Sequence, residues 1–224
     1  MLLALSFKLY ALMEIVFIDN HMLAADKPHN LLTQPSGTDR DSLEAQAKLF
    51  IKNKFHKPGN VFLEAVHRID RQACGIVLFA RTSKALSRLT EQIRNGSCRK
   101  IYRALVTGRL PQTEGILEDW LVHDDFKAAV VPAGSDGAKR ATLRYRLLET
   151  RTDGHSLLEI QLETGRYHQI RAQLAHAGCP IVGDDRYGSK EPYKNGAVAL
   201  QHASLTVLHP ITKEPITFEA KHTL

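Results

Sequence analysis

The densest group of chemically active side chains lies within residues 66–82, where one carboxylate, Asp70, stands among His67, Arg68 and Arg71. Cations so close in sequence should favour the ionised form of Asp70, provided that the fold brings their charges near it. A single ionised carboxylate in a basic neighbourhood suits a nucleophile or base that acts on an anionic substrate. The alternative is an Asp paired with Arg in a turn before a strand, because structural ion pairs also perturb carboxylates.

The elements around this group follow from hydrophobic periodicity and capping residues. The continuous apolar run 76–80 predicts a buried strand directly after the group. Helices are expected over 39–54, with Asp41 as N-cap, and over 82–95. Trp120 is expected in the core. Further strands are expected at 14–18, 22–25, 98–108, 141–148, 157–162 and 216–220, with short strand-like pieces at 116–121 and 128–131 and a helix ending at 177.

The charge of the chain is unevenly distributed. Residues 67–110 carry ten Lys or Arg against two acids, a net charge of +8 in a chain whose total is +6, so the remainder is slightly acidic. A concentrated basic region is typical of a protein that binds a polyanion, and it indicates nucleic acid. The alternative is a set of solvated helix and strand faces.

Cysteines and histidines give no metal signature. The chain has three cysteines, far apart and without Cys-x-x-Cys spacing, which disfavours a zinc ribbon or redox pair and fits a reducing, cytoplasmic compartment. His168 and His176 lie eight residues apart, two helical turns, which is too far for one ion. Residues 1–18 are apolar but lack the basic segment and cleavage site of a signal peptide, and they are too polar to span a membrane. Because a strand-like run begins at Met13, residues 1–13 are expected to be a disordered extension or an over-long start.

The residues around Asp70 also resemble a known signature. His-Arg-Ile-Asp-Arg-x-x-x-Gly over 67–75 is similar to the His-Arg-Leu-Asp-Arg-x-Thr-Ser-Gly signature of the RluA-type pseudouridine synthases. In that family the Asp is the catalytic residue, so the resemblance assigns this role to Asp70. The sequence departs from the signature at Ala73 and Cys74, which puts in doubt only the hydroxyl contacts of the turn.

Two further motifs of the family precede and follow this signature. Asp-Lys-Pro-His-Asn over 26–30 resembles Asn-Lys-Pro-x-Gly, and Asn30 replaces the glycine because Asn tolerates left-handed backbone angles. Lys-x-Tyr-x-Ala-Leu-Val from Lys100 resembles the motif whose Tyr stacks on the target base, which implies this role for Tyr102. A period of two puts Lys100 on the same face as Tyr102, and we expect that face to be wet and to meet anions. The alternative for Tyr102 is that its ring packs in the core and does not stack on a base.

A fourth motif is complete. Glu-Thr-Gly-Arg-x-His-Gln-Ile-Arg over 163–171 matches the family pattern, with Tyr167 at its variable position. The resemblance implies that Arg171 pairs with the catalytic Asp, and a guanidinium can hold a carboxylate by two bonds, whereas Lys cannot. If Arg171 is taken without the motif around it, the alternative is an arginine on the exposed face of a helix. The loop 180–188 also follows the family, and Asp184 and Tyr187 are expected to make turn hydrogen bonds there.

The resemblance implies an α+β pseudouridine synthase fold, a mixed and mainly antiparallel sheet flanked by helices with a central catalytic cleft, over residues 14–224 and with no S4-type domain. It implies an RNA pseudouridine synthase that isomerises uridines in ribosomal or transfer RNA, which the sequence does not separate. No cofactor or metal is implied, and we expect a monomer. The implied catalytic residues are Asp70, Tyr102 and Arg171, and the RNA-binding residues are Arg68, Arg71, Lys100, Arg166 and His168.

Two other functions stay open. A catalytically inert RNA-binding module of the same fold is suggested by the departure at Ala73 and Cys74. A hydrolytic enzyme that removes uracil is the other alternative, but it normally needs a second placed carboxylate, which the motif around Asp70 does not supply.

Overall fold

The computed structural model describes residues 13–221 and 223–224. The expected extension at the N-terminus therefore lies almost wholly outside the described residues. The chain divides into two compact units. The first comprises the residues up to Cys98 and His202–Thr223, and the second comprises Arg99–Gln201 with the last residue.

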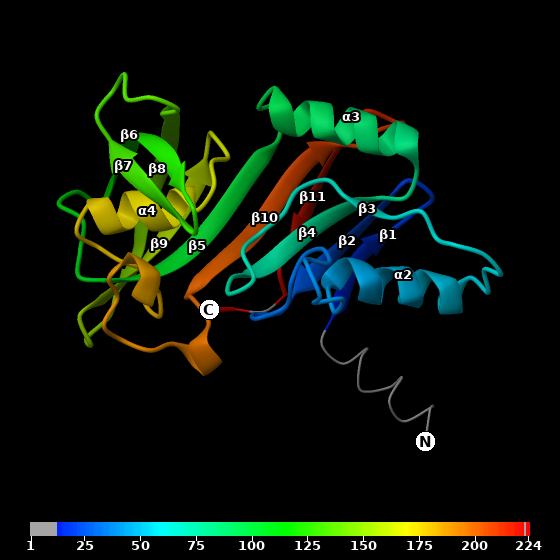
Figure 1. The fold of residues 1–224 in the computed structure, drawn as a ribbon, viewed down its shortest axis with the longest axis horizontal. Helices are drawn as coiled ribbons and strands as arrows, with labels where there is room; N and C mark the ends of the chain where they lie inside the picture. The colour runs from blue at the N-terminus through cyan, green and yellow to red at the C-terminus, as the bar shows by residue number, and fades with distance from the viewer. Residues whose placement is uncertain (1–12, 222) are drawn as a thin grey trace. The chain divides into compact units, whose positions relative to one another are not determined.

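The first unit is a set of antiparallel strands with two helices. Its strands run in the order β1-β2-β4-β10, with β3 paired to β4 and β11 paired to β10. The elements are β1 (Glu14–Ile18), β2 (Met22–Lys27), α2 (Leu43–Lys54), β3 (Glu64–Ala65), β4 (Cys74–Ala80), α3 (Ser83–Arg94), β10 (Leu200–Leu208) and β11 (Pro215–Glu219). Figure 1 shows the strands of this unit running between α3 and α2.

The core of the first unit explains why β2 and β4 are apolar throughout. On one face, alternate residues of both strands pack with Ala85 and Leu89 of α3 and with Leu205 and Phe218. The residues of β4 that point to the opposite face, Val77 and Phe79, are also fully buried. Burial on both faces is the condition under which a strand loses its polar alternation, so the expected buried strand at 76–80 is confirmed.

Helix α2 begins later than expected. Its N-cap is Ser42, whose hydroxyl accepts from the Ala45 amide, and not Asp41. Residues 36–39 cannot join the helix because Ser36 and Asp39 exchange two backbone hydrogen bonds in a short bridge. Helix α3 follows the prediction, since the Thr82 hydroxyl accepts from the Ala85 amide as its N-cap.

The second unit is a set of antiparallel strands in the order β5-β9-β8-β6-β7. Its elements are β5 (Arg99–Thr107), β6 (Glu114–Asp124), β7 (Lys127–Val131), β8 (Lys139–Thr150), β9 (His155–Leu162), α4 (Gln169–His176) and two short 3-10 helices, η1 (Asp185–Tyr187) and η2 (Lys194–Gly196). The strand-like pieces expected at 116–121 and 128–131 are thus parts of a regular hairpin of β6 and β7. Trp120 lies opposite Val131 in this hairpin and is only partly buried, so its expected place in the core was wrong.

Candidate active site

Asp70 lies on the loop that joins β3 to β4, and it is partly exposed. The backbone on both sides of it is fixed by hydrogen bonds. The Thr33 hydroxyl donates to the Ile69 carbonyl at 3.0 Å and accepts from the Ile69 amide at 3.3 Å. The Ala73 amide donates to the Asp70 carbonyl at 3.2 Å. The carboxylate therefore stands on a held loop rather than on a mobile one.

The strongest support of this loop comes from Lys27, the last residue of β2, which is fully buried. Its Nζ donates to the carbonyls of Leu31 and Ala73, both at 2.7 Å, of Pro28 at 3.0 Å and of Arg71 at 3.1 Å. An ammonium has three N–H groups, so the four carbonyl oxygens leave none of them without an acceptor and share one of them. Lys27 thereby ties the segment after β2 to both sides of the loop that carries the carboxylate.

The buried surroundings of Lys27 disfavour its charged form. Burial lowers the pKa of Lys27 to about 7, because an ammonium loses its hydration there, and the Asp70 carboxylate acts in the opposite direction. Lys27 was not among the residues expected at the site. The available signal was a lysine that ends the apolar run 22–25 and precedes Pro28, since a lysine at the end of a buried strand needs polar partners.

The segment after β2 and the loop that carries Asp70 are joined by further contacts. The His29 ring nitrogen Nδ1 lies 2.8 Å from the Gln72 carbonyl, and the Arg71 Nε donates to the Asn30 carbonyl at 3.3 Å. Asn30 has φ of 64°, so the expected left-handed conformation is confirmed. The motif over 26–30 thus acts as the support of the loop that carries Asp70.

The residues after Asp70 turn the chain into β4 through a close backbone contact. Gly75 has φ of +111°, and a Cβ there would lie 2.3 Å from the His202 carbonyl oxygen, so only glycine fits. Ala73 and Cys74, where the family usually has hydroxyls, are 2% and 4% exposed. The small side chains of Ala73 and Cys74 fit these buried positions, and neither carries a hydroxyl.

The two arginines that flank Asp70 are exposed. The Arg71 side chain is 60% exposed, and its Nη1 lies 3.8 Å from the Asp39 carboxylate. Arg68 is also exposed, and both guanidiniums are therefore accessible to a polyanion. Their predicted contacts with RNA stay predictions.

Arg171 lies at the centre of a buried polar cluster in the second unit. Its Nε and Nη2 donate to the two carboxylate oxygens of Asp184 at 2.7 and 2.8 Å, and both side chains are almost fully buried. Its Nη1 lies 3.0 Å from the His168 Nε2, and the guanidinium lies 5.0 Å from the centre of the Tyr187 ring. The pairing expected between Arg171 and Asp70 joins residues of the two units and stays a prediction.

The expected turn hydrogen bonds of Asp184 and Tyr187 are present in the backbone, where the Tyr187 amide donates to the Asp184 carbonyl. The Asp184 carboxylate has a further role that was not expected, the bidentate ion pair with Arg171. The Tyr187 hydroxyl accepts from the Ala128 amide at 2.6 Å and lies 3.0 Å from the His168 Nδ1. A fully buried carboxylate needs a cationic partner such as Arg171, whereas a carboxylate in an exposed turn is hydrated by water.

The other expected site residues lie on or near β5 and α4. Lys100 and Tyr102 are each 8% exposed, so the expected wet face of this strand was wrong. The Lys100 ammonium lies beside Gly165, since a Cβ there would be 3.6 Å from its Nζ, and a neighbour from so distant a segment cannot be read from strand periodicity. Arg166 is exposed and its Nε donates to the Arg140 carbonyl, while His168 is buried between Arg171 and Tyr187.

The described residues contain neither a metal-binding cluster nor a membrane-spanning helix. In residues 13–221 and 223–224, no three His, Cys, Asp or Glu side chains are grouped so that they could hold a metal ion. Within the same residues, no helix has the length and apolar character needed to cross a membrane.

Comparisons with known proteins place these motifs in a wider group. The family model described as RNA pseudouridylate synthase matches residues 21–176. A Zymomonas mobilis protein named ribosomal large subunit pseudouridine synthase D is 32% identical over 220 residues, 93% of this chain and 69% of that protein. A Pectobacterium carotovorum protein named tRNA pseudouridine synthase C is 27% identical over 228 residues, 94% of this chain and 59% of that protein.

A Chloroflexus aurantiacus protein named as an RNA pseudouridine synthase is 44% identical over 149 residues, 65% of this chain. The chain spans 45% of that relative's length. Among solved structures, human RNA pseudouridylate synthase domain containing 4 superposes with a TM-score of 0.79 at 21% identity, over 97% of this chain and 91% of the human chain. At that identity the likeness shows the fold, which agrees with the expected α+β class.

Proposed function

The chain belongs to the RNA pseudouridylate synthase family, and we propose that it isomerises uridine in structured RNA, ribosomal or transfer, to pseudouridine, with Asp70 as the catalytic carboxylate. The N1–C1′ bond of uridine breaks, the uracil turns, and a C5–C1′ bond forms. C5 loses its proton to solvent and N1 takes one up. The atoms balance without an oxidant, a reductant or a nucleoside triphosphate.

One observation supports this role for Asp70 above the others. It is the partly exposed carboxylate of a loop whose backbone is fixed by Thr33 on one side and by the buried Lys27 ammonium beneath. Catalysis by a carboxylate depends on holding it in the attacking geometry before the substrate arrives. A loop held by several buried hydrogen bonds supplies this condition.

The remaining roles follow from the family motifs. Asp70 attacks C1′ or removes a proton from the sugar, Tyr102 stacks on the uracil, and Arg171 holds the carboxylate. The target nucleotide must leave the base stack before this chemistry can begin. Arg68, two residues before Asp70 and exposed, is suited to fill the vacated place in the helix. The exposed Arg71 and Arg166 are proposed to contact the RNA, whereas Lys100 and His168 are not, because both are buried.

The test is the release of tritium from RNA that carries tritium at uridine C5. Large-subunit ribosomal RNA and transfer RNA, each transcribed with this label, serve as substrates. A synthase releases tritium to water and leaves the RNA strand intact, with an unchanged number of bases. Free uracil would identify a hydrolase, and binding without either product would identify an inert RNA-binding module.

A further inference from the structure

The C-terminal end of α2 carries basic and aromatic residues that the proposed chemistry does not use. Residues 52–60 are all exposed, and they contain Lys52, Lys54 and Lys57 but no acid. Lysines in the last turn of a helix are explained by the helix dipole. The dipole does not explain Phe55, whose side chain is 44% exposed beside them.

Cations from two separate segments converge on the Phe55 ring. The Arg81 guanidinium, from the residue after β4, lies 5.1 Å from the ring centre, and the Lys54 Nζ lies 5.8 Å from it. Lys54 also lies 5.4 Å from the centre of the Phe50 ring. Arg81 is anchored by a hydrogen bond from its Nη1 to the Asp19 carbonyl. An exposed aromatic ring with cations beside it is an arrangement used to bind single-stranded nucleic acid, and here one of the cations, Arg81, is anchored.

In the part of the chain that the structure describes, none of the four cations of this surface forms an ion pair with a carboxylate, although the charge of Asp19 acts on Arg81. Asp19, the acid whose charge acts on Arg81, is engaged by His209 at 2.8 Å and by the amides of His21 and Met22. The basic-aromatic surface, defined as Lys52, Lys54, Phe55, Lys57 and Arg81, thus carries four positive charges around one exposed ring.

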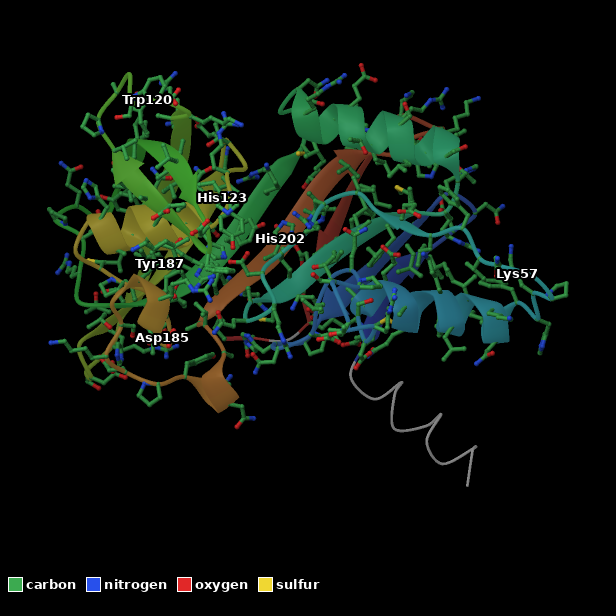
Figure 2. The ribbon with its side chains drawn as sticks, viewed as in Figure 1. Lys57, Trp120, His123, Asp185, Tyr187 and His202 are labelled. Atoms are coloured by element: carbon green, nitrogen blue, oxygen red, sulfur yellow. The ribbon has the colours of Figure 1, made fainter. Side chains whose placement is uncertain are left out.

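This surface lies at the far end of β4 from the loop of Asp70. Asp70 precedes the seven residues of β4 and Arg81 follows them, so at about 3.3 Å per residue the strand separates them by roughly 20 Å. Figure 2 agrees, because Lys57 and His202, the residue behind Gly75, lie at opposite ends of this unit. A nucleic acid on this surface is therefore several nucleotides away from the nucleotide at Asp70.

We infer that the basic-aromatic surface binds a single-stranded flank of the substrate RNA, with one base stacked on Phe55 and the neighbouring phosphates on Lys54, Lys57 and Arg81. The inference rests on the proposed function only for the identity of the polyanion as substrate RNA. Stacking on a phenyl ring tolerates any base, and phosphate contacts read no sequence. The surface therefore adds affinity and orientation rather than sequence choice.

The test measures binding of the full chain to fluorescein-labelled dodecameric oligouridine and to an abasic ribose-phosphate strand of equal length. Phe55→Ala should weaken binding to oligouridine by at least about fivefold and leave binding to the abasic strand unchanged. Phe55→Trp should restore oligouridine binding, which a loss of folding would not allow. Lys54→Ala with Lys57→Ala should weaken binding to both strands and reduce the salt slope by about 1.4.

Matched controls are available in the second unit. Phe126 is 76% exposed but stands beside Asp124 and Asp125, so Phe126→Ala should leave binding unchanged. The double variant Lys190→Ala with Lys194→Ala removes two exposed lysines, one of which lies 5.1 Å from the Tyr193 ring centre. It should change the salt slope much less than the pair from α2.

The results separate this inference from the proposed function. Oligouridine binding by Phe55→Ala that equals that of the wild type, or a Phe55 effect that persists on the abasic strand, overturns the stacking site. The absence of tritium release from labelled RNA by the wild-type chain overturns the synthase proposal alone, because the binding measurements involve no turnover.

Discussion

Replacing Lys27 by Met should destabilise the protein through the loop that carries Asp70. Two of the four carbonyls around the ammonium, those of Leu31 and Ala73, are bonded at 2.7 Å in fully buried positions. A buried carbonyl that loses its donor costs about 1–3 kcal/mol, so the two together cost about 2–6 kcal/mol. Met fills most of the same volume and has no charge to desolvate, which offsets part of this loss of stability. We expect the free energy of unfolding to fall by about 2–4 kcal/mol.

Urea denaturation followed by circular dichroism measures this change, and tritium release measured well below the denaturation midpoint reports on the loop. Turnover should fall more than RNA binding, because catalysis depends on the exact position of the Asp70 carboxylate, whereas phosphate contacts of the long exposed side chains of Arg68 and Arg71 tolerate a small shift of the loop. Lys48→Met is the matched control. Lys48 pairs with Glu44 across one helical turn and is 35% exposed, so its loss should cost less than about 1 kcal/mol. Equal midpoints for Lys27→Met and the wild type would refute the structural role of Lys27.

Three further substitutions test separate features. Gly75→Ala should lower the free energy of unfolding by about 3 kcal/mol or more in urea, because the new Cβ would lie 2.3 Å from the carbonyl of His202 at a positive φ; a loss under 1 kcal/mol would contradict this contact. Arg171→Lys should lower the free energy of unfolding by about 1–3 kcal/mol, because an ammonium cannot hold both oxygens of the buried Asp184; unchanged denaturation would exclude the two-bonded pair. Hydrogen bonds to neighbouring carboxylates raise the pKa of His155, so its stabilisation is complete below about pH 6.5 and is lost as the pH rises through the raised value. His155→Gln should therefore lower the melting temperature at pH 5.5 but not at pH 9, and an equal loss at both values would rule out the ion pairs.

Local signals in the sequence were sufficient for the elements that the chain encodes over short distances. The apolar run of β4 and the Thr82 cap of α3 both gave the observed element, because strand burial and N-capping depend on residues within a few positions of each other. The left-handed Asn30 was predictable for the same reason. The start of α2 was missed because the bridge between Ser36 and Asp39 competes with the helix for its first residues.

The candidate site was less predictable because its supports come from distant segments. The acceptors of Lys27 include carbonyls 44 and 46 residues further along the chain, and no local pattern identifies them. The partner of Arg171 within its own unit, Asp184, lies 13 residues away and resembles a turn residue in sequence. Lys100 is buried and has Gly165, 65 residues further along the chain, as a neighbour. The motifs therefore located the candidate residues but not the contacts that hold them.

The central claim is that the Asp70 carboxylate performs the isomerisation, and Asp70→Asn tests it most directly. The amide keeps the shape of the side chain and removes its charge, so the loop should keep its fold and the exposed arginines should keep their affinity for RNA. Tritium release from RNA labelled at uridine C5 is measured for the wild type and for Asp70→Asn at saturating RNA. We predict that the variant binds RNA like the wild type and releases no tritium, and release by Asp70→Asn at the wild-type rate would contradict the account.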